Sequence, residues 1–350
     1  MPGNSVERRL YFPSKTMTGT RIKKYVTTLN EIFKSAPSKH EAHYRSGAVL
    51  AEMSGDSEFL TQVLAKHLSS PGTLDSRHYP VVSIDIELNS YYGLVANCWI
   101  PLPGRETDIA TKPIHHHGTM LLTTVTAYGP GYEHWTFQLP ARLDEEHDLF
   151  SARLIEHAPH PLSHRAFVDA FVAHLPFFPP SLTITFALWS NRTRTSWKDH
   201  LKRLPILRGN EARLRDLAVG LKLAGALDLK LVEYFDFYPT CDGFKGMKTR
   251  QEYELGPNEN YLFSLFHVIQ QTGNEKLAKI VEEKLSKGTE GDNRQVVQGL
   301  LEDLHHGRLI EGRLSEGHYG LPHANFTRTQ LLSALAQQEN FRQAETVPGV

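Results

Sequence analysis

The chain has 350 residues, of which 40% are hydrophobic and 22% are charged, and its formal net charge at pH 7 is −1. This composition is ordinary for a globular protein, and so small a net charge gives no electrostatic reason to expect nucleic acid or an anionic membrane as a partner. The first residues lack the apolar core of a signal peptide, and no apolar run reaches the roughly 18 residues of a membrane-spanning helix. Only two cysteines occur, far apart in sequence, so we expect a cytoplasmic protein without a disulfide framework.

Residues 1–77 are predicted to form an N-terminal helical region. Hydrophobic residues recur at helical spacing from Thr20 to Ser35, and Asp56 stands where the N-cap of another helix belongs, just before Phe59 and Leu60. We expect these helices to cover the outside of the next region.

Residues 78–192 are predicted to form strands. Val82–Leu88 alternates apolar and polar residues, which is typical of a strand with one buried face. Many short strands separated by Gly, Pro, Asp and Asn, with no pattern of helix length between them, predict an antiparallel barrel or jelly roll. The other expected strands are 94–100, 114–128, 132–139, 152–157, 165–171 and 181–189.

Residues 193–350 are predicted to form a C-terminal helical region. The segment 261–269 is apolar almost all round, which predicts a buried helix, and 214–224, 277–281 and 296–304 carry apolar stripes. These faces could cap the barrel or form the interface of a homodimer, and we favour the cap.

The triplet His115-His116-His117 is the most informative feature of the strand region. Nine of the chain's 19 histidines lie between His115 and His174. Because side chains alternate on a strand, His115 and His117 should share one face while His116 points to the other. Two imidazoles on one face are two ligands for a first-row transition metal, and the alternative is a solvated histidine cluster at a strand end.

The strand region resembles the cupin superfamily over residues 78–192. The first cupin motif is a pair of histidines separated by one residue, then a glutamate, then a glycine. Here His115 and His117 supply the pair and Gly129 is the glycine, but Leu122 (or Leu121) stands where the glutamate belongs.

A second cupin motif contributes one further histidine near the last strands of the barrel, and His174 resembles it. The proline and glycine that precede this histidine in the motif, and the asparagine that follows it, are replaced by Asp169, Phe171 and Phe178. The resemblance therefore implies a cupin-like β-barrel, a jelly roll whose metal is held by His115, His117 and His174.

A cupin with three histidines and no glutamate looks most like the cysteine dioxygenase-like branch, whose iron is held by three neutral imidazoles. That resemblance implies Fe(II), with open positions for a chelating substrate and O₂ together. It implies a mononuclear non-haem oxygenase or dioxygenase that acts on a small polar molecule. Imidazole also suits Mn, Ni and Zn, so these metals stay open as alternatives.

Other histidines compete for the third ligand position. His157, His160 and His164 lie in a proline-containing turn between two expected strands, and either His164 or His160 could replace His174 if the register differs by one strand. A solvated turn is the alternative interpretation for this group. His116 is expected to support the site without binding the metal.

Several neighbours could act on the substrate. Tyr128 and His134 are the candidate catalytic residues, since a tyrosine can donate a proton and a histidine can serve as a general acid or base, whereas core filling is the alternative for both. The arginines Arg142, Arg153 and Arg165 could bind a substrate carboxylate, or simply face solvent.

Two other functions remain open from the sequence. A cupin lyase or isomerase would use Mn, Ni or Zn as a Lewis acid with His134 or Glu133 as the base, and a binding protein would use the barrel as a ligand sensor. No dinucleotide-binding glycine motif, phosphate-binding loop or hydrolase nucleophile motif occurs, which argues against those enzyme classes.

Overall fold

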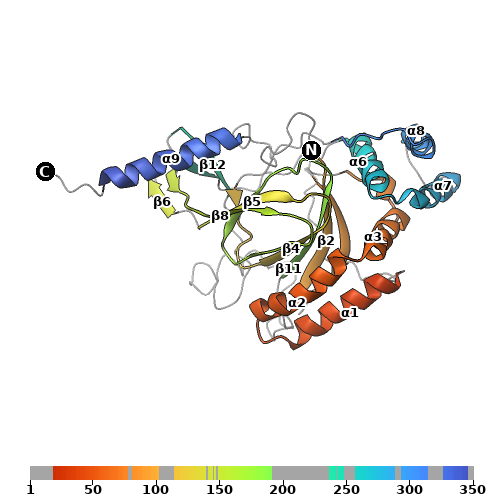
Figure 1. The fold of residues 1–350 in the computed structure, drawn as a ribbon, viewed down its shortest axis with the longest axis horizontal. Helices are drawn as coiled ribbons and strands as arrows, with labels where there is room; N and C mark the ends of the chain where they lie inside the picture. Colours follow the sequence, from red (N-terminus) through yellow and green to blue (C-terminus); the bar gives the residue numbers. More distant parts are fainter. Residues whose placement is uncertain are drawn as a thin grey trace, which may run out of the picture.

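A computed structural model describes residues 19–77, 81–101, 114–138, 141–144, 146, 149–190, 236–241, 243–247, 257–287, 293–313 and 326–345. Within these residues two antiparallel sheets lie between two groups of helices (Figure 1). The expected helical stripe at 214–224 lies outside the described residues. Within them, none of the helices is long and apolar enough to cross a membrane.

The helices follow the sequence patterns closely. The helix predicted from Thr20 to Ser35 is present, and the Asp56 carboxylate caps the third helix by accepting a hydrogen bond from the Phe59 backbone N–H at 3.1 Å. Residues 261–269 lie in a buried helix, as predicted. The α-helices are α1 (Thr20–Ser35), α2 (Lys39–Ser54), α3 (Ser57–Ser69), α6 (Asn258–Gln271), α7 (Ala278–Ser286), α8 (Arg294–His305) and α9 (Arg328–Glu345). Two short 3₁₀ helices are η1 (Thr73–Asp75) and η2 (Glu275–Leu277).

The strands form one five-stranded and one eight-stranded sheet. Their order is β1-β2-β11-β4-β9 in the first and β6-β7-β13-β12-β3-β10-β5-β8 in the second. The strands are β1 (Val82–Leu88), β2 (Tyr92–Trp99), β3 (Ile114–His115), β4 (Leu121–Tyr128), β5 (Tyr132–Phe137), β6 (Ala141–Asp144), β7 (Leu149–Ser151), β8 (Leu154–His160), β9 (Arg165–Val168), β10 (Ala173–Pro176), β11 (Thr183–Ser190), β12 (Asp236–Thr240) and β13 (Gly243–Met247).

Eight of these strands have the connectivity of a jelly roll. Their pairs are nested along the chain: β2 pairs with β11, β3 with β10, β4 with β9, and β5 with β8. This is the pattern of one long hairpin rolled up, with four strands in each sheet. The predicted cupin-like jelly roll with flanking helices is confirmed.

Several features of the strands were not expected from the sequence, including β6 and β7. The segment 114–128 is two strands, because the backbone turns between His117 and Met120. The four-residue strand β10 was not predicted. Nor were β12 and β13, which lie within 193–350 and lengthen the second sheet, where β12 pairs with β3.

Helices cover the outer face of the five-stranded sheet. Val125 of β4 and Phe186 of β11 share one apolar core with Leu29 of α1 and Phe59 of α3. The rings of Phe59 and Phe186 meet edge to face with 5.1 Å between centroids. The apolar residues of this sheet therefore point away from the interior of the jelly roll.

The eight-stranded sheet is also apolar on its outer face, where α9 packs (Figure 1). Ile114, Phe137 and Phe237 form a buried cluster with Leu331 of α9. Since side chains alternate along a strand, the residues between these point into the jelly roll, and they include His115.

The inner faces of the two sheets are largely polar. Thr124, Thr126 and Thr185 of the five-stranded sheet are buried there. Trp99 donates from Nε1 to the Thr185 hydroxyl at 3.0 Å and stacks on Tyr132 of β5, with 5.4 Å between ring centroids. Hydroxyls and imidazoles therefore line much of the space between the two sheets, beside the smaller apolar cluster of Leu122, Val168 and Ala187.

The turn 129–131 contains the expected closing glycine. Gly129 and Gly131 have φ of +82° and +90°, and a Cβ on either would overlap a carbonyl oxygen, that of Leu182 or of His160 respectively. Only glycine fits both conditions, so this turn fixes where β5 begins.

A buried histidine between α2 and the sheet makes stability depend on pH. His43 places Nδ1 2.7 Å from the Thr123 hydroxyl, and burial, followed by repulsion from His40 and Lys39, lowers its pKa to about 3. The unfolded chain takes up this proton near pH 6.5 and the folded chain does not, so stability is complete above that pH and is lost as pH falls.

We expect His43→Gln to reduce the pH slope of the unfolding free energy between pH 6 and 4 by about one proton, or ~1.4 kcal/mol per pH unit. Urea unfolding at several pH values measures this slope. His157→Gln, at an exposed position, serves as the control. Equal slopes for His43→Gln and the unmodified protein would contradict the assignment.

Candidate metal centre

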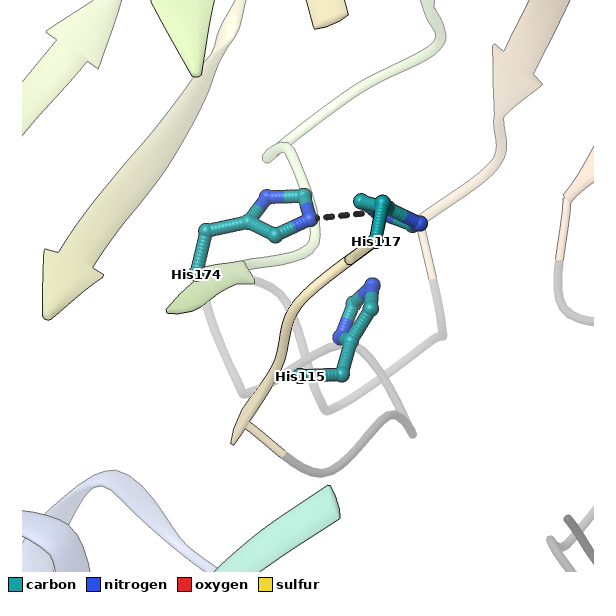
Figure 2. Close-up of side chains that lie close together, drawn as sticks. All are labelled: His115, His117 and His174. Carbon is teal, nitrogen blue, oxygen red and sulfur yellow. Dashed lines mark hydrogen bonds between the residues drawn. The ribbon is translucent and has the colours of Figure 1, made fainter. Parts of the chain in front are cut away.

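The structure brings His115, His117 and His174 together inside the jelly roll (Figure 2). One nitrogen of each ring lies within 4.8 Å of the other two. The Nε2 atoms of His117 and His174 are 2.8 Å apart, and the His115 ring centroid is 4.4 Å from that of His174 and 4.9 Å from that of His117. These residues are the expected ligand set.

Strand register explains the convergence of the three rings. His115 and His174 stand directly opposite each other in the antiparallel pairing of β3 and β10. β3 ends at His115, and His117 lies on the same side two residues later, just before a turn closed by a hydrogen bond from the Met120 N–H to the His117 carbonyl. The alternation expected for a strand is thus kept beyond the strand's end.

The middle histidine of the triplet has a separate environment. His116 is buried outside the cluster, and its Nδ1 accepts a hydrogen bond from the Gly118 N–H at 3.0 Å. The Gly118 carbonyl accepts another from the Phe171 N–H at 2.8 Å. Burial lowers the pKa of His116, which keeps the ring neutral and able to accept. His116 therefore holds the turn between His117 and β4.

His134 touches the far side of one of the three rings. It lies on β5, and its Nε2 is 2.7 Å from Nδ1 of His174, the nitrogen that faces away from His117. Burial, and then repulsion from His160 and His115, lowers the pKa of His134 well below its usual value. A neutral His134 can accept the Nδ1 proton of His174 and so fix the orientation of that ring.

His160 and His164, the alternative third ligands, lie further along a row of imidazoles. Ring centroids are 5.0 Å apart from His174 to His134, 4.9 Å from His134 to His160 and 4.7 Å from His160 to His164. His160 is buried, with its pKa lowered to about 4 by burial, and His164 is exposed. The structure places neither in the cluster with His115 and His117.

Tyr128, the other candidate catalytic residue, is not near the cluster. It packs on the outer core of the five-stranded sheet, and its hydroxyl donates to the Gln271 carbonyl at the end of α6. The register of β4 and β11 shifts between Ile184 and Thr185, so Tyr128 pairs with Ile184 although Thr126 pairs with Thr185. This irregularity turns Tyr128 to the outer face. A proton-donating role at the metal does not fit this position.

Three of the charged candidates, Arg165, Arg153 and Glu133, have environments separate from the three rings. Arg165 rests against Gly47 of α2, and Arg153 is exposed. The side chain of Arg142 lies outside the described part of the structure. Glu133 forms a bidentate ion pair with Arg328 of α9, with both contacts at 2.7 Å, on the outer face of the sheet. That carboxylate is therefore not placed to act as a base in the site.

Two residues near the rings were not assigned to the site from the sequence. Trp189 of β11 has its ring centroid 4.3 Å from that of His117. Leu122, at the position of the missing glutamate, is buried in an apolar cluster with Val168 and Ala187. The only sequence signal for Trp189 was its place on an alternating strand, which many core residues share.

The donor atoms fit a transition metal ion. Two imidazole nitrogens bound at right angles to an ion at ~2.1 Å would be about 3.0 Å apart, close to the 2.8 Å between His117 and His174. His134 supplies the hydrogen-bond partner that metal-binding histidines usually have. All three donors are neutral when they bind, and imidazole suits iron, nickel, copper and zinc. The residues present therefore fit an ion, without selecting which one.

Comparisons with known proteins find only weak similarities. No protein-family model matches the chain, and no curated protein matches its sequence. Among solved structures, hydroquinone 1,2-dioxygenase from Sphingomonas sp. TTNP3 is 11% identical over 34% of this chain and 69% of its own, with a TM-score of 0.24. A Klebsiella pneumoniae protein with a double-stranded beta-helix domain is 12% identical over 33% and 85%, with a TM-score of 0.21. Lactobacillus farciminis oxalate decarboxylase is 13% identical over 45% and 42%, with a TM-score of 0.22. Such low scores carry no argument about activity.

We expect the purified protein to hold about one metal ion per chain, and His115→Ala, His117→Ala and His174→Ala each to lose most of it while remaining folded. Elemental mass spectrometry measures the metal, and circular dichroism checks the fold. His164→Ala, at an exposed position outside the cluster, should keep it. Metal retained in His174→Ala but lost in His164→Ala would move the third ligand.

We also expect His134→Leu to weaken metal affinity by about 10- to 100-fold, because the Nδ1 proton of His174 loses its acceptor. His134→Gln keeps an acceptor oxygen and should bind more tightly than the leucine variant. Competition with a chelating dye measures both affinities. Unchanged affinity in His134→Leu, with a loss of activity alone, would instead indicate a direct catalytic role.

Proposed function

We propose that this protein is a metal-dependent enzyme of the cupin type, a mononuclear non-haem iron oxygenase or dioxygenase that acts on a small molecule. The observation that carries the proposal is the group of three convergent imidazoles inside a jelly roll. Among the described residues, this group of possible ligands contains no carboxylate. The resemblance to three-histidine cupins points in the same direction.

The neutral donor set supports the choice of reaction. Three imidazoles leave a divalent ion with its full charge and with open positions for a chelating substrate and for O₂. When bound, Fe(II) would supply a Lewis acid, an electron source and a template that holds the two reactants together. A carboxylate ligand would offset part of the charge and fill one of those positions.

The chain's own residues would hold and isolate this centre. His134 keeps the Nδ1 proton of His174 in place and so presents Nε2 toward the ion. Leu122 and the apolar residues around it exclude water from the wall at the position of the missing glutamate. Because Tyr128 and Glu133 face outward, proton transfer would depend on His134, on the substrate, on water or on residues outside the described part of the chain.

The remaining predictions concern partners and location. We propose a small-molecule substrate and O₂ as reactants, and we do not expect nucleic acid or membrane partners. A homodimer and a cytoplasmic location stay predictions from the sequence. There are two alternatives: a metal-dependent lyase or isomerase that uses Mn, Ni or Zn, and a ligand sensor. The following experiment separates them from the oxygenase.

We expect protein loaded with Fe(II) to consume O₂ when it converts a substrate from a panel of small molecules with two adjacent oxygen or nitrogen donors. An oxygen electrode measures the uptake, and His174→Ala with the same panel provides the control. Conversion that continues under strict anaerobiosis would exclude the oxygenase and favour the lyase or isomerase. Binding without conversion under either condition would favour the sensor.

A further inference from the structure

The cluster of three histidines is more exposed at His117 than at its other two members. His115 and His174 are 6% and 5% exposed, whereas His117 is half-buried. His117 is therefore the member of the cluster that solvent reaches most. The residue on that flank is Trp189, whose indole meets the His117 ring edge to face at an interplanar angle of 71°.

Trp189 differs from the other tryptophans that the structure describes. Trp99 is 7% exposed and donates from Nε1 to Thr185, and Trp135 is 3% exposed and donates from Nε1 to Glu133 at 2.6 Å. Trp189 is half-buried, and within the described residues its Nε1 has no hydrogen-bond partner. Tryptophans that only fill a core are usually buried with their N–H satisfied. Trp189 instead has an exposed part of its ring that a ligand can contact.

The surroundings of Trp189 are apolar. It packs, with Val95 and Val172, against the buried cluster of Leu122, Val168 and Ala187. A ligand bound to the ion would meet imidazoles on one side and this apolar wall on the other. A purely polar ligand would lose water against that wall and find few hydrogen-bond partners there, at a cost in free energy.

We propose, on the basis of the metal-dependent function above, that the substrate carries a flat apolar ring, of aromatic type, next to its metal-binding group, and that Trp189 selects it. The indole offers a π face and edge to such a ring, and aromatic pairs are favourable beyond the area that they bury. Its Nε1–H, which has no hydrogen-bond partner among the described residues, can donate to an oxygen on the metal-binding end of the ligand. This refines the expected small polar molecule into one that is polar at one end only.

The experiment compares two chelators that share a donor group and differ in one ring. Benzohydroxamate and acetohydroxamate both bind a metal through the same two oxygens, so their ratio of dissociation constants isolates the contribution of the phenyl group. Anaerobic calorimetric titration of the Fe(II)-loaded protein measures both constants. We expect Trp189→Leu to reduce the preference for benzohydroxamate about fivefold to tenfold while acetohydroxamate affinity changes little, and Trp189→Phe to retain most of it.

Controls separate this inference from the proposed function. Phe167→Ala removes an exposed aromatic ring from the outer face of β9, where it contacts His40 and His43, and should leave the ratio unchanged. Metal content is measured for every variant, and Trp189→Met, which also removes the aromatic ring, serves as the test if Trp189→Leu does not fold. An unchanged ratio in a metal-loaded Trp189→Leu variant would overturn the role of Trp189. Failure of the unmodified protein to bind metal would overturn the proposed function itself.

Discussion

The antiparallel pairing of β3 and β10 is the constraint on which the candidate site depends. It sets His115 directly opposite His174 and so fixes the spacing of two of the three rings. Yet β3 has only two residues and β10 only four, too few to hold a register alone. β12 on one side and β5 on the other pair with them and supply the missing hydrogen bonds. Strands far from the histidines in sequence therefore maintain the geometry of the site.

The fold can hold buried histidines because most of its apolar side chains are buried on the outer faces of the two sheets. Both sheets bury most of their hydrophobic residues on the outer side, against α1, α2, α3 and α6 on one sheet and α9 on the other. The bidentate contact of Arg328 with Glu133 ties the start of α9 to β5, on the face opposite His134. With two outer cores, the interior can hold hydroxyls and neutral imidazoles at little cost to the fold.

Local patterns in the sequence predicted the elements that local interactions determine. The helical spacing at 20–35 and the alternation at 82–88 gave α1 and β1, because each pattern is long enough to specify its own structure. β10 and β12 were missed, since both are short and contain proline, and pairing with β3 makes them strands. Tyr128 was misplaced because one irregularity in β4 reverses the alternation. The three histidines could be grouped because alternation and the cupin-like motif agreed, whereas nothing in the sequence separated Trp189 from core aromatics.

Leu122, at the position where the cupin motif has a glutamate, has two effects. It leaves out a negative charge, and it adds an apolar side chain. A carboxylate at Leu122 would add a negative charge beside three neutral donors and would break the cluster with Val168 and Ala187. Without that carboxylate, the charge of a divalent ion is balanced by the ligand itself, and the side chain at position 122 is apolar. Both effects favour a ligand with an anionic, metal-binding end and an apolar body. Under the proposed function, the leucine at this position of the cupin-like motif thus bears on both the charge of the ion and the choice of its ligand.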